Sequence, residues 1–588
     1  MNVRNRWFLL FTALVSIAMI AAVACGGTSS SDKTATASAG GGGKTPAATS
    51  AGGAPADMAP TDQQKLTLNA QSEPNTEDPQ AVSYTYELTV NHQLFVALFD
   101  QDPKTSQLIP WGAAEVPTVA NGGIAADGVT YTIKIKPGLK WSDGSPLTAT
   151  DFAYGIVRSF DLNVSGSGYG GFFTNIKGAD AAAKLDPKSA TYAADVAAAL
   201  KDSVVAVDAT TLKLVAATKS ASFLSNLVLA VTAPTQKANV EALGANYGVA
   251  ASAAQMVTSG PFKIKEWSPK DHITIVPNDN YNAGKKPFLQ EVTFKFIDDQ
   301  NQAYNAYQSG QLDEAMVPAA LYPQVSGDAS MKDQLHQEEE FGTRWIAVDV
   351  TIPPWNNKDF VIGMNQATDR EAISKDVYFG LRKAWTAPCP AAVVGCDPTI
   401  FKNLEYNLDA AKASIAKAYP NGNIPEVTLE TVNDPTTKAL ATTLQSQWDK
   451  VGVKVNIVTT DQKTLRADMK EHKAGTQITG WGMDYADPTD LWAIFNSSSI
   501  GGNNLGFYDR PDYDKVEASQ DAELDPTARK PLLTQLQQFL AADPPVIQFA
   551  IQLRTDVLKP YVKGLVSSPF NYIIYGDQQL VDVYIAKH

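Results

Sequence analysis

The clearest pattern in the chain is an alternation of apolar and polar residues over 129–136, in which Tyr131 and Ile133 are apolar and their neighbours are polar. This period predicts a strand with one buried face. Pro137 and Gly138 then predict a turn. Thr148, with Asp151 three residues later, predicts the start of a helix whose apolar residues fall on one stripe. We therefore expect a strand, a turn and a helix in succession.

The same reasoning predicts alternating strands and helices along most of the chain. A helix rich in Ala and Tyr should follow residue 296 and end at Gly310. Such alternation is typical of α/β proteins. The remaining predicted elements are strands at 262–265, 273–275, 292–296, 427–429 and 453–458, and helices at 369–379, 408–417 and 435–451.

The N-terminus has the form of an export sequence. Arg4 and Arg6 precede an apolar run over 7–24, which ends in small residues immediately before Cys25. A basic segment followed by an apolar one is typical of a secretory signal. The boundary resembles a bacterial lipobox, so we expect a lipoprotein signal peptide at 1–24 and lipid attachment at Cys25. An uncleaved signal anchor and an ordinary cut after Ala24 are the alternatives.

Residues 25–61 follow the lipid attachment point and are almost wholly Gly, Ala, Ser, Thr and Pro. Such a segment lacks the apolar side chains that could offset the loss of chain entropy on folding. We expect a flexible tether that holds a folded body near the outer face of the cell membrane, in the cell envelope or periplasmic space.

Composition excludes several classes of function. The chain has 588 residues with 48 Lys and Arg against 62 Asp and Glu, a formal net charge of −14. This sign argues against nucleic acid or an anionic membrane surface as the main partner, so we expect contact with the membrane through the lipid only. Three Cys and five His leave little material for metal or haem chemistry, and we expect neither a metal site nor a cofactor.

Cys389 and Cys396 enclose six residues in a predicted loop. An exported protein can keep a disulfide there. A redox-active pair is the alternative, but such pairs usually have the tighter C-x-x-C spacing. We therefore expect a structural disulfide.

Motifs for catalysis are missing from the sequence. It contains neither H-E-x-x-H nor G-x-S-x-G, and the formal G-x-G-x-x-G at 166–171 does not follow a strand. Asp484, Asp487 and Asp490 suggest calcium, but Ala486 and Pro488 break the alternating ligand spacing of a calcium loop. We predict no catalytic residue, and an exported hydrolase remains the alternative of lowest rank, because the separation of paired carboxylates is spatial.

One long block of sequence goes further than these patterns. Residues 131–154, which include Trp141-Ser-Asp-Gly144, resemble the hallmark stretch of the family 5 extracellular solute-binding proteins, the oligopeptide- and dipeptide-binding components of bacterial ABC importers. The likeness extends from about residue 62 to the C-terminus. Its further blocks, in the order of the family, are 259–267, 278–281, 306–313, 367–373, 480–488 and 559–564.

The resemblance implies an α/β fold of the periplasmic-binding-protein type, type II, with two lobes, an extra inserted domain and a ligand cleft between the lobes. Closure of such lobes around a ligand is a known switching mode. By resemblance, the first lobe comprises 62–95, 232–341 and 555–588, the inserted domain 96–231, and the second lobe 342–554.

The resemblance also implies site residues. In this family an Asp at the place of Asp484 binds the ammonium group of a peptide, and a Trp at the place of Trp481 lines the same pocket. Tyr485, Tyr169 and Tyr86 are further expected contributors to the cleft walls. The strand before Trp481 has no Arg for a carboxylate, so the group that anchors the other end of the ligand is left unassigned.

The implied function is that of a substrate-binding lipoprotein, expected to be a monomer, that captures short peptides and delivers them to the permease and ATPase subunits of an ABC transporter. No bond is made or broken. Family members also bind oligosaccharides, nickel chelates or other chelates on the same fold, so these ligands are the alternatives to peptides.

Overall fold

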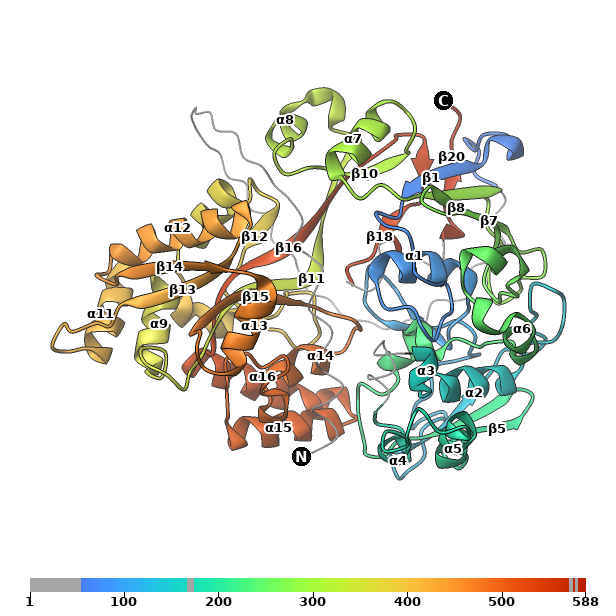
Figure 1. Cartoon of the computed structure of the whole chain (residues 1–588), viewed down its shortest axis with the longest axis horizontal. Coiled ribbons are helices and arrows are strands. Elements are labelled where there is room, and N and C mark those ends of the chain that lie inside the picture. The colour runs from blue at the N-terminus through green and yellow to red at the C-terminus, as the bar shows by residue number, and fades with distance from the viewer. Residues whose placement is uncertain (1–53, 166–173, 571–574, 577–579) are drawn as a thin grey trace.

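The computed structural model describes residues 54–165, 174–570, 575–576 and 580–588. The expected signal peptide, Cys25, most of the tether and Tyr169 lie outside these residues. Within the described part, no helix is both long and apolar enough to cross a membrane. The described chain forms two α/β bodies joined by long strands (Figure 1).

The first lobe is built on a four-stranded sheet of order β1-β9-β8-β7, in which β1 and β9 run parallel and the other neighbours antiparallel. Apolar side chains such as Leu66 and Phe294 alternate into its buried face. The elements are β1 (Lys65–Asn69), α1 (Thr85–Leu94), α6 (Lys237–Leu243), β7 (Phe262–Ser268), β8 (His272–Pro277), β9 (Glu291–Lys295), α7 (Gln300–Gln308) and α8 (Tyr322–Gly327).

A smaller unit with its own sheet, of order β4-β6-β5, is attached to the first lobe. The predicted strand, turn and helix are confirmed here, because Thr148 and Asp151 form a capping box at the start of α2. Its elements are β2 (Phe99–Gln101), β3 (Leu108–Pro110), β4 (Thr130–Lys134), α2 (Ala149–Arg158), α3 (Leu162–Ser165), α4 (Ala179–Ala182), α5 (Tyr192–Leu200), β5 (Val204–Asp208) and β6 (Thr211–Val215).

The second lobe is built on the sheet β10-β16-β11-β15, with β12 also paired to β16, and on the parallel pair β13-β14. Its elements are β10 (Glu314–Met316), β11 (Leu335–Val348), α9 (Lys358–Ala367), α10 (Arg370–Ala372), β12 (Arg382–Ala384), α11 (Leu408–Ala418), β13 (Val427–Val432), α12 (Pro435–Asp449), β14 (Val455–Thr460), α13 (Gln462–Lys470), β15 (Thr476–Gly482), α14 (Thr489–Trp492), α15 (Pro511–Ala522), α16 (Pro526–Ala542) and β16 (Val546–Leu558). Short strands close the chain: β17 (Val562–Lys563), β18 (Val566–Ser567), β19 (Tyr575–Gly576) and β20 (Tyr584–Ile585).

The long antiparallel strands β11 and β16 run from the second lobe toward the first (Figure 1). The far end of β16 pairs with β10, and Asp313 directly before β10 is bonded to Thr67 on β1 of the first lobe. The Asp313 backbone N–H donates to Thr67 O at 2.8 Å, and the Asp313 carboxylate accepts the Thr67 N–H at 2.7 Å. The expected limits of the second lobe, 341/342 and 554/555, fall inside β11 and β16. Continuous strands of this kind can act as a hinge between lobes.

One predicted helix differs from the structure. The expected helix at 369–379 is a single α-turn, α10, followed by a π-turn over Ile373–Val377. The segment then ends at Gly380 with a φ of 88°, a conformation that glycine adopts without strain.

The expected disulfide is present. Cys389 and Cys396 are joined, with their Cα atoms 6.0 Å apart.

Candidate ligand site at the edge of β15

The strand β15 lies at the end of its sheet and pairs with β11 along one side. Asp349 N–H donates to Gly475 O at 3.0 Å, and Met483 N–H donates to Phe341 O at 2.8 Å. Antiparallel pairs alternate between bonded and non-bonded residues. By this alternation the backbone N–H and C=O groups of Gly480 point away from β11, toward the outer edge of the sheet.

Gly482, two residues further along, points its backbone groups in the same direction as Gly480. Neither residue has a side chain to cover these groups. A Cβ at position 480 would lie 2.0 Å from Thr343 O, so that site accepts only glycine. The edge of β15 therefore offers bare backbone donors and acceptors, the arrangement to which an extended peptide can add as a further strand.

The segment that follows this edge brings three of the expected site residues together. Trp481 is partly buried and packs against the apolar clusters of both the first and the second lobe. Asp484 donates its backbone N–H to the Asp490 carboxylate at 2.7 Å. Tyr485 is only 6 % exposed and belongs to the same buried cluster as residues of the first lobe. Its ring is thus mostly a packing element, and little of it is open to a ligand.

The site is rich in carboxylates. Burial raises the pKa of Asp490 well above its usual value, and the nearby charge of Asp484 raises that pKa further. Burial likewise raises the pKa of the Tyr485 phenol, with added effects from Asp490 and Asp487. Asp490 therefore stays protonated at pH values at which an exposed Asp is charged. The carboxyl oxygens gathered here are hydrogen-bond acceptors, which suit a cationic donor such as an ammonium group better than an anion.

A buried guanidinium balances part of this charge. Arg529 on α16 donates to both carboxylate oxygens of Asp487, at 2.6 and 2.7 Å, and to the Thr489 hydroxyl at 2.8 Å. Gln520 accepts a further bond from Arg529 at 3.0 Å. This network fixes the loop after Asp484 through the pair of Arg529 and Asp487.

The same region touches the smaller unit of the other lobe. Ser220 Oγ and Ser222 Oγ donate to the Asp521 carboxylate at 3.0 and 3.2 Å. Asp521 lies in the last turn of α15, which faces the smaller unit at the bottom of Figure 1. This contact and the strands β11 and β16 thus connect the two lobes at separate places.

Tyr86 lies in the first lobe, near the start of α1. Its ring stacks on Tyr84 with centroids 5.3 Å apart. Burial raises the pKa of Tyr86 to about 12, with a further contribution from the charge of Glu87. The structure therefore places Tyr86 on a different lobe from Trp481, Asp484 and Tyr485, while Tyr169 lies outside the described residues.

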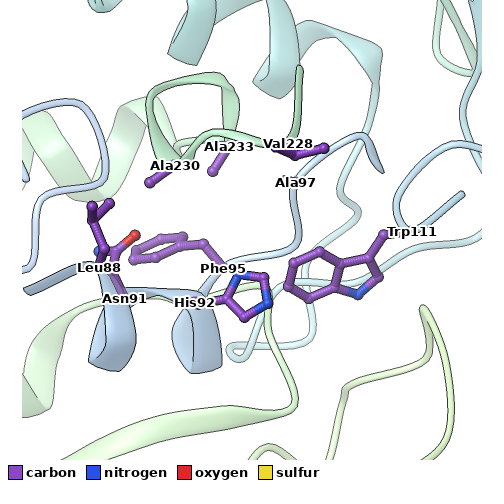
Figure 2. Close-up of a pocket in the computed structure, with 9 residues that line it drawn as sticks. All are labelled: Leu88, Asn91, His92, Phe95, Ala97, Trp111, Val228, Ala230 and Ala233. Atoms are coloured by element: carbon purple, nitrogen blue, oxygen red, sulfur yellow. The ribbon is translucent and has the colours of Figure 1, made fainter. Parts of the chain in front are cut away.

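A separate pocket, where the first lobe meets the smaller unit, is too small for a peptide. His92, Asn91 and Trp111 contribute polar atoms to its lining, as Figure 2 shows. It has room for about one water molecule, whereas ligand sites for small molecules are far larger. Among the residues that the structure describes, no group of three His, Cys, Asp or Glu side chains is placed to hold a metal ion.

Comparison with known proteins decides the family. The model of the bacterial extracellular solute-binding proteins, family 5 (middle), matches residues 108–503. The chain belongs to this family. A family 5 relative, the oligopeptide-binding protein OppA of Bacillus subtilis, is 25% identical over 584 residues, which cover 96% of this chain and 97% of that protein.

Other family 5 comparisons show the range of ligands and the fold. Heme-binding protein A of Haemophilus influenzae is 26% identical over 474 residues, covering 77% of this chain and 82% of that protein. The solved structure of MppA, a periplasmic murein tripeptide binding protein in its unliganded open form, superposes with a TM-score of 0.76 at 24% identity and covers 91% of this chain and 99% of its own. The expected two-lobed α/β fold is confirmed.

Several residues that shape the site give no recognisable signal in the sequence. The spacing of Asp487 and Asp490 suggests only calcium ligands, because it shows neither the Arg529 pair nor the burial of Asp490. Asp521 has no local motif at all. The strand before Trp481 has no Arg, but Arg344 on the neighbouring strand lies directly opposite Gly480.

Proposed function

We propose that this protein is the substrate-binding lipoprotein of an ABC importer, which captures short peptides outside the membrane and delivers them to the permease and ATPase subunits. The bare edge of β15 at Gly480 and Gly482, immediately before the acidic loop of Asp484, is the observation that carries the proposal. An extended peptide has the backbone groups to pair with this edge. The relative OppA is named as an oligopeptide-binding protein.

In this proposal Asp484 receives the ammonium group at the start of the peptide. A charged hydrogen bond between a carboxylate and an ammonium group is short and strong, and the reduced dielectric between two closed lobes strengthens it. Trp481 supplies an apolar wall beside the charge. Tyr86 and Tyr169 contribute from the first lobe and its attached unit when the lobes close.

Export and anchoring complete the proposal. Residues 1–24 direct the chain out of the cytoplasm, and Cys25 carries the lipid. As a flexible coil, the tether of about 37 residues has a span of roughly 30–35 Å, enough to keep the lobes clear of the lipid headgroups. The protein then acts as a monomer at the outer face of the membrane.

Native mass spectrometry of the protein, purified without denaturation, tests the proposal. A bound mass that is released as a short peptide supports it. A released oligosaccharide, metal chelate or haem identifies another ligand class of the same fold and contradicts peptide capture. Incubation with a peptide mixture separates receptor from hydrolase, because a receptor leaves every peptide intact.

A further inference from the structure

Arg344 on β11 is a partly buried guanidinium without a carboxylate partner. Its Nη2 donates to Gln552 Oε1 on β16 at 3.0 Å. In the described part of the chain, no Asp or Glu oxygen lies within ion-pair distance of it, whereas the neighbouring Arg554 pairs with Asp556 and Glu314. The burial of this arginine costs desolvation free energy, which its bond to Gln552 offsets only in part.

A second arginine lies on the same face of this sheet. Arg382 on β12 is directly opposite Gln552 in the register of β12 and β16. Its guanidinium carbon is 5.7 Å from the centroid of the Tyr378 ring, and its Nη1 donates to Leu381 O at 3.0 Å. Burial, followed by the charge of Arg382, lowers the pKa of Arg344 to about 10. The two guanidinium groups thus repel each other.

Glu340 is the carboxyl group whose charge acts on both arginines, and it compensates them only in part. Burial raises its pKa, although Arg554 and Arg382 act in the opposite direction. It also interacts with Gln552 through a hydrogen bond. Gln552 therefore lies between Glu340 and Arg344, and the Arg344 guanidinium keeps donors for another acceptor.

Arg344 lies beside the bare edge of β15. It is opposite Gly480 in the β11–β15 register, and a Cβ at position 480 would lie 2.8 Å from Arg344 Cδ. The missing side chain of Gly480 thus leaves the arginine next to the backbone groups that point outward. Four residues separate Asp484 from Gly480, so an extended ligand that starts at Asp484 and rises about 3.3 Å per residue passes Arg344 at about its fourth or fifth residue.

We propose that Arg344, assisted by Arg382, binds a carboxylate of the ligand. The inference rests on the proposed function, since it deepens the same site by stating the chemistry at its second end. A carboxylate suits a guanidinium because two parallel N–H···O bonds can form. It can be the C-terminal carboxylate of a short peptide or the side chain of an Asp or Glu in the ligand. The ligand carboxylate supplies the negative charge that Glu340 provides to Arg344 only in part.

Retention of defined peptide pools tests this inference. The protein is incubated with random tripeptides to pentapeptides that have free N-termini, once as free acids and once as C-terminal amides, and the retained peptides are identified by native mass spectrometry. Wild type is compared with Arg344→Gln, Arg382→Gln and Lys454→Gln. The last variant removes one positive charge from an exposed position of the same lobe. Thermal unfolding checks that each variant is folded.

If the C-terminal carboxylate is bound, wild type retains free acids about 10- to 100-fold better than amides, the range expected for hydrogen bonds to a charged group. If an acidic side chain is bound, amides that contain Asp or Glu are retained preferentially. In both cases Arg344→Gln removes the preference, Arg382→Gln reduces it and Lys454→Gln keeps it. Equal retention of acids, amides and neutral peptides by wild type overturns the inference but leaves peptide capture standing. Retention of no peptide at all overturns the proposed function and the inference with it.

Discussion

Arg529 donates to both oxygens of the Asp487 carboxylate, at 2.6 and 2.7 Å, where both side chains are nearly excluded from solvent. The pair holds the start of α14 against α16, directly after the segment that contains Asp484. A buried ion pair contributes little compared with an apolar pair of similar shape, but breaking it leaves an uncompensated charge. The position of Asp484 therefore depends on a contact that is distant in sequence.

Arg529→Met should lower the free energy of unfolding by about 3–5 kcal/mol, because the Asp487 charge stays buried without its partner. Urea-induced unfolding measures the loss. Lys265→Met is the matched control, since it breaks the pair of the exposed Lys265 with Glu291 and should cost much less stability than Arg529→Met. Equal losses in the two variants would contradict a buried role for Arg529.

Asp490 should make stability depend on pH. Between the ordinary carboxyl pKa of about 4 and the raised pKa of folded Asp490, the unfolded chain has released a proton that the folded chain keeps. Raising the pH through this window therefore destabilises the fold through this group. Asp490→Asn removes the effect. The unfolding temperature of the variant minus that of wild type should therefore increase as the pH rises from about 4 to 7.

Asp328 provides a control of opposite sign for this measurement. Hydrogen bonds from the Ser330 side chain and backbone lower the pKa of its exposed carboxyl group. Its contribution to stability is therefore present above the ordinary pKa and lost as the pH falls. Asp328→Asn should lose stability relative to wild type as the pH rises. A difference between Asp490→Asn and wild type that does not change with pH would refute the protonated state of Asp490.

Asp521→Ala should weaken ligand binding, because the variant loses the hydrogen bonds from Ser220 and Ser222 that join the lobes. A ligand held between two lobes gains from any contact that favours their approach. At about 0.5–1.5 kcal/mol for each of the two bonds, we expect a loss of about 5- to 150-fold in affinity by calorimetry. Ser519→Ala, at an exposed position of the same helix, should leave affinity unchanged. If both variants bind like wild type, this contact has no part in closure.

Local elements could be predicted from sequence, whereas the contacts that build the site could not. The strand β4 and the capped start of α2 follow from alternation and from Thr148, which are local patterns. The bond between Arg344 and Gln552 joins residues 208 apart, and that between Ser220 and Asp521 joins residues 301 apart. No period in the chain encodes such pairs, because the order of strands in the sheet brings them together.

The three aspartates of the loop show the same limit. Asp484, Asp487 and Asp490 look equivalent in sequence, and their spacing suggests only a broken calcium loop. In the structure Asp487 is paired with Arg529, and Asp490 is buried and accepts the Asp484 backbone N–H. Their different environments give them different charges, and burial is a property of the folded chain that spacing does not contain.

Lipid attachment is predicted at Cys25. Cells that express the protein with radiolabelled palmitate should incorporate the label into wild type and not into Cys25→Ser. The variant should also leave the membrane fraction wherever its signal peptide is removed, since the tether alone has no apolar segment to hold it. A processed Cys25→Ser protein that stays with the membrane would show that another feature anchors the chain.

The central claim is that Asp484 binds the ammonium group of a peptide, and a double-mutant cycle by calorimetry tests it most directly. A peptide that co-purifies with the protein is titrated, with a free and with an acetylated N-terminus, into wild type and Asp484→Asn. Each single change should cost about 2–5 kcal/mol, because it leaves one charge without its partner. Both changes together should cost little more than one alone, since they remove the same pair. Losses that simply add would show that Asp484 and the ammonium group do not meet.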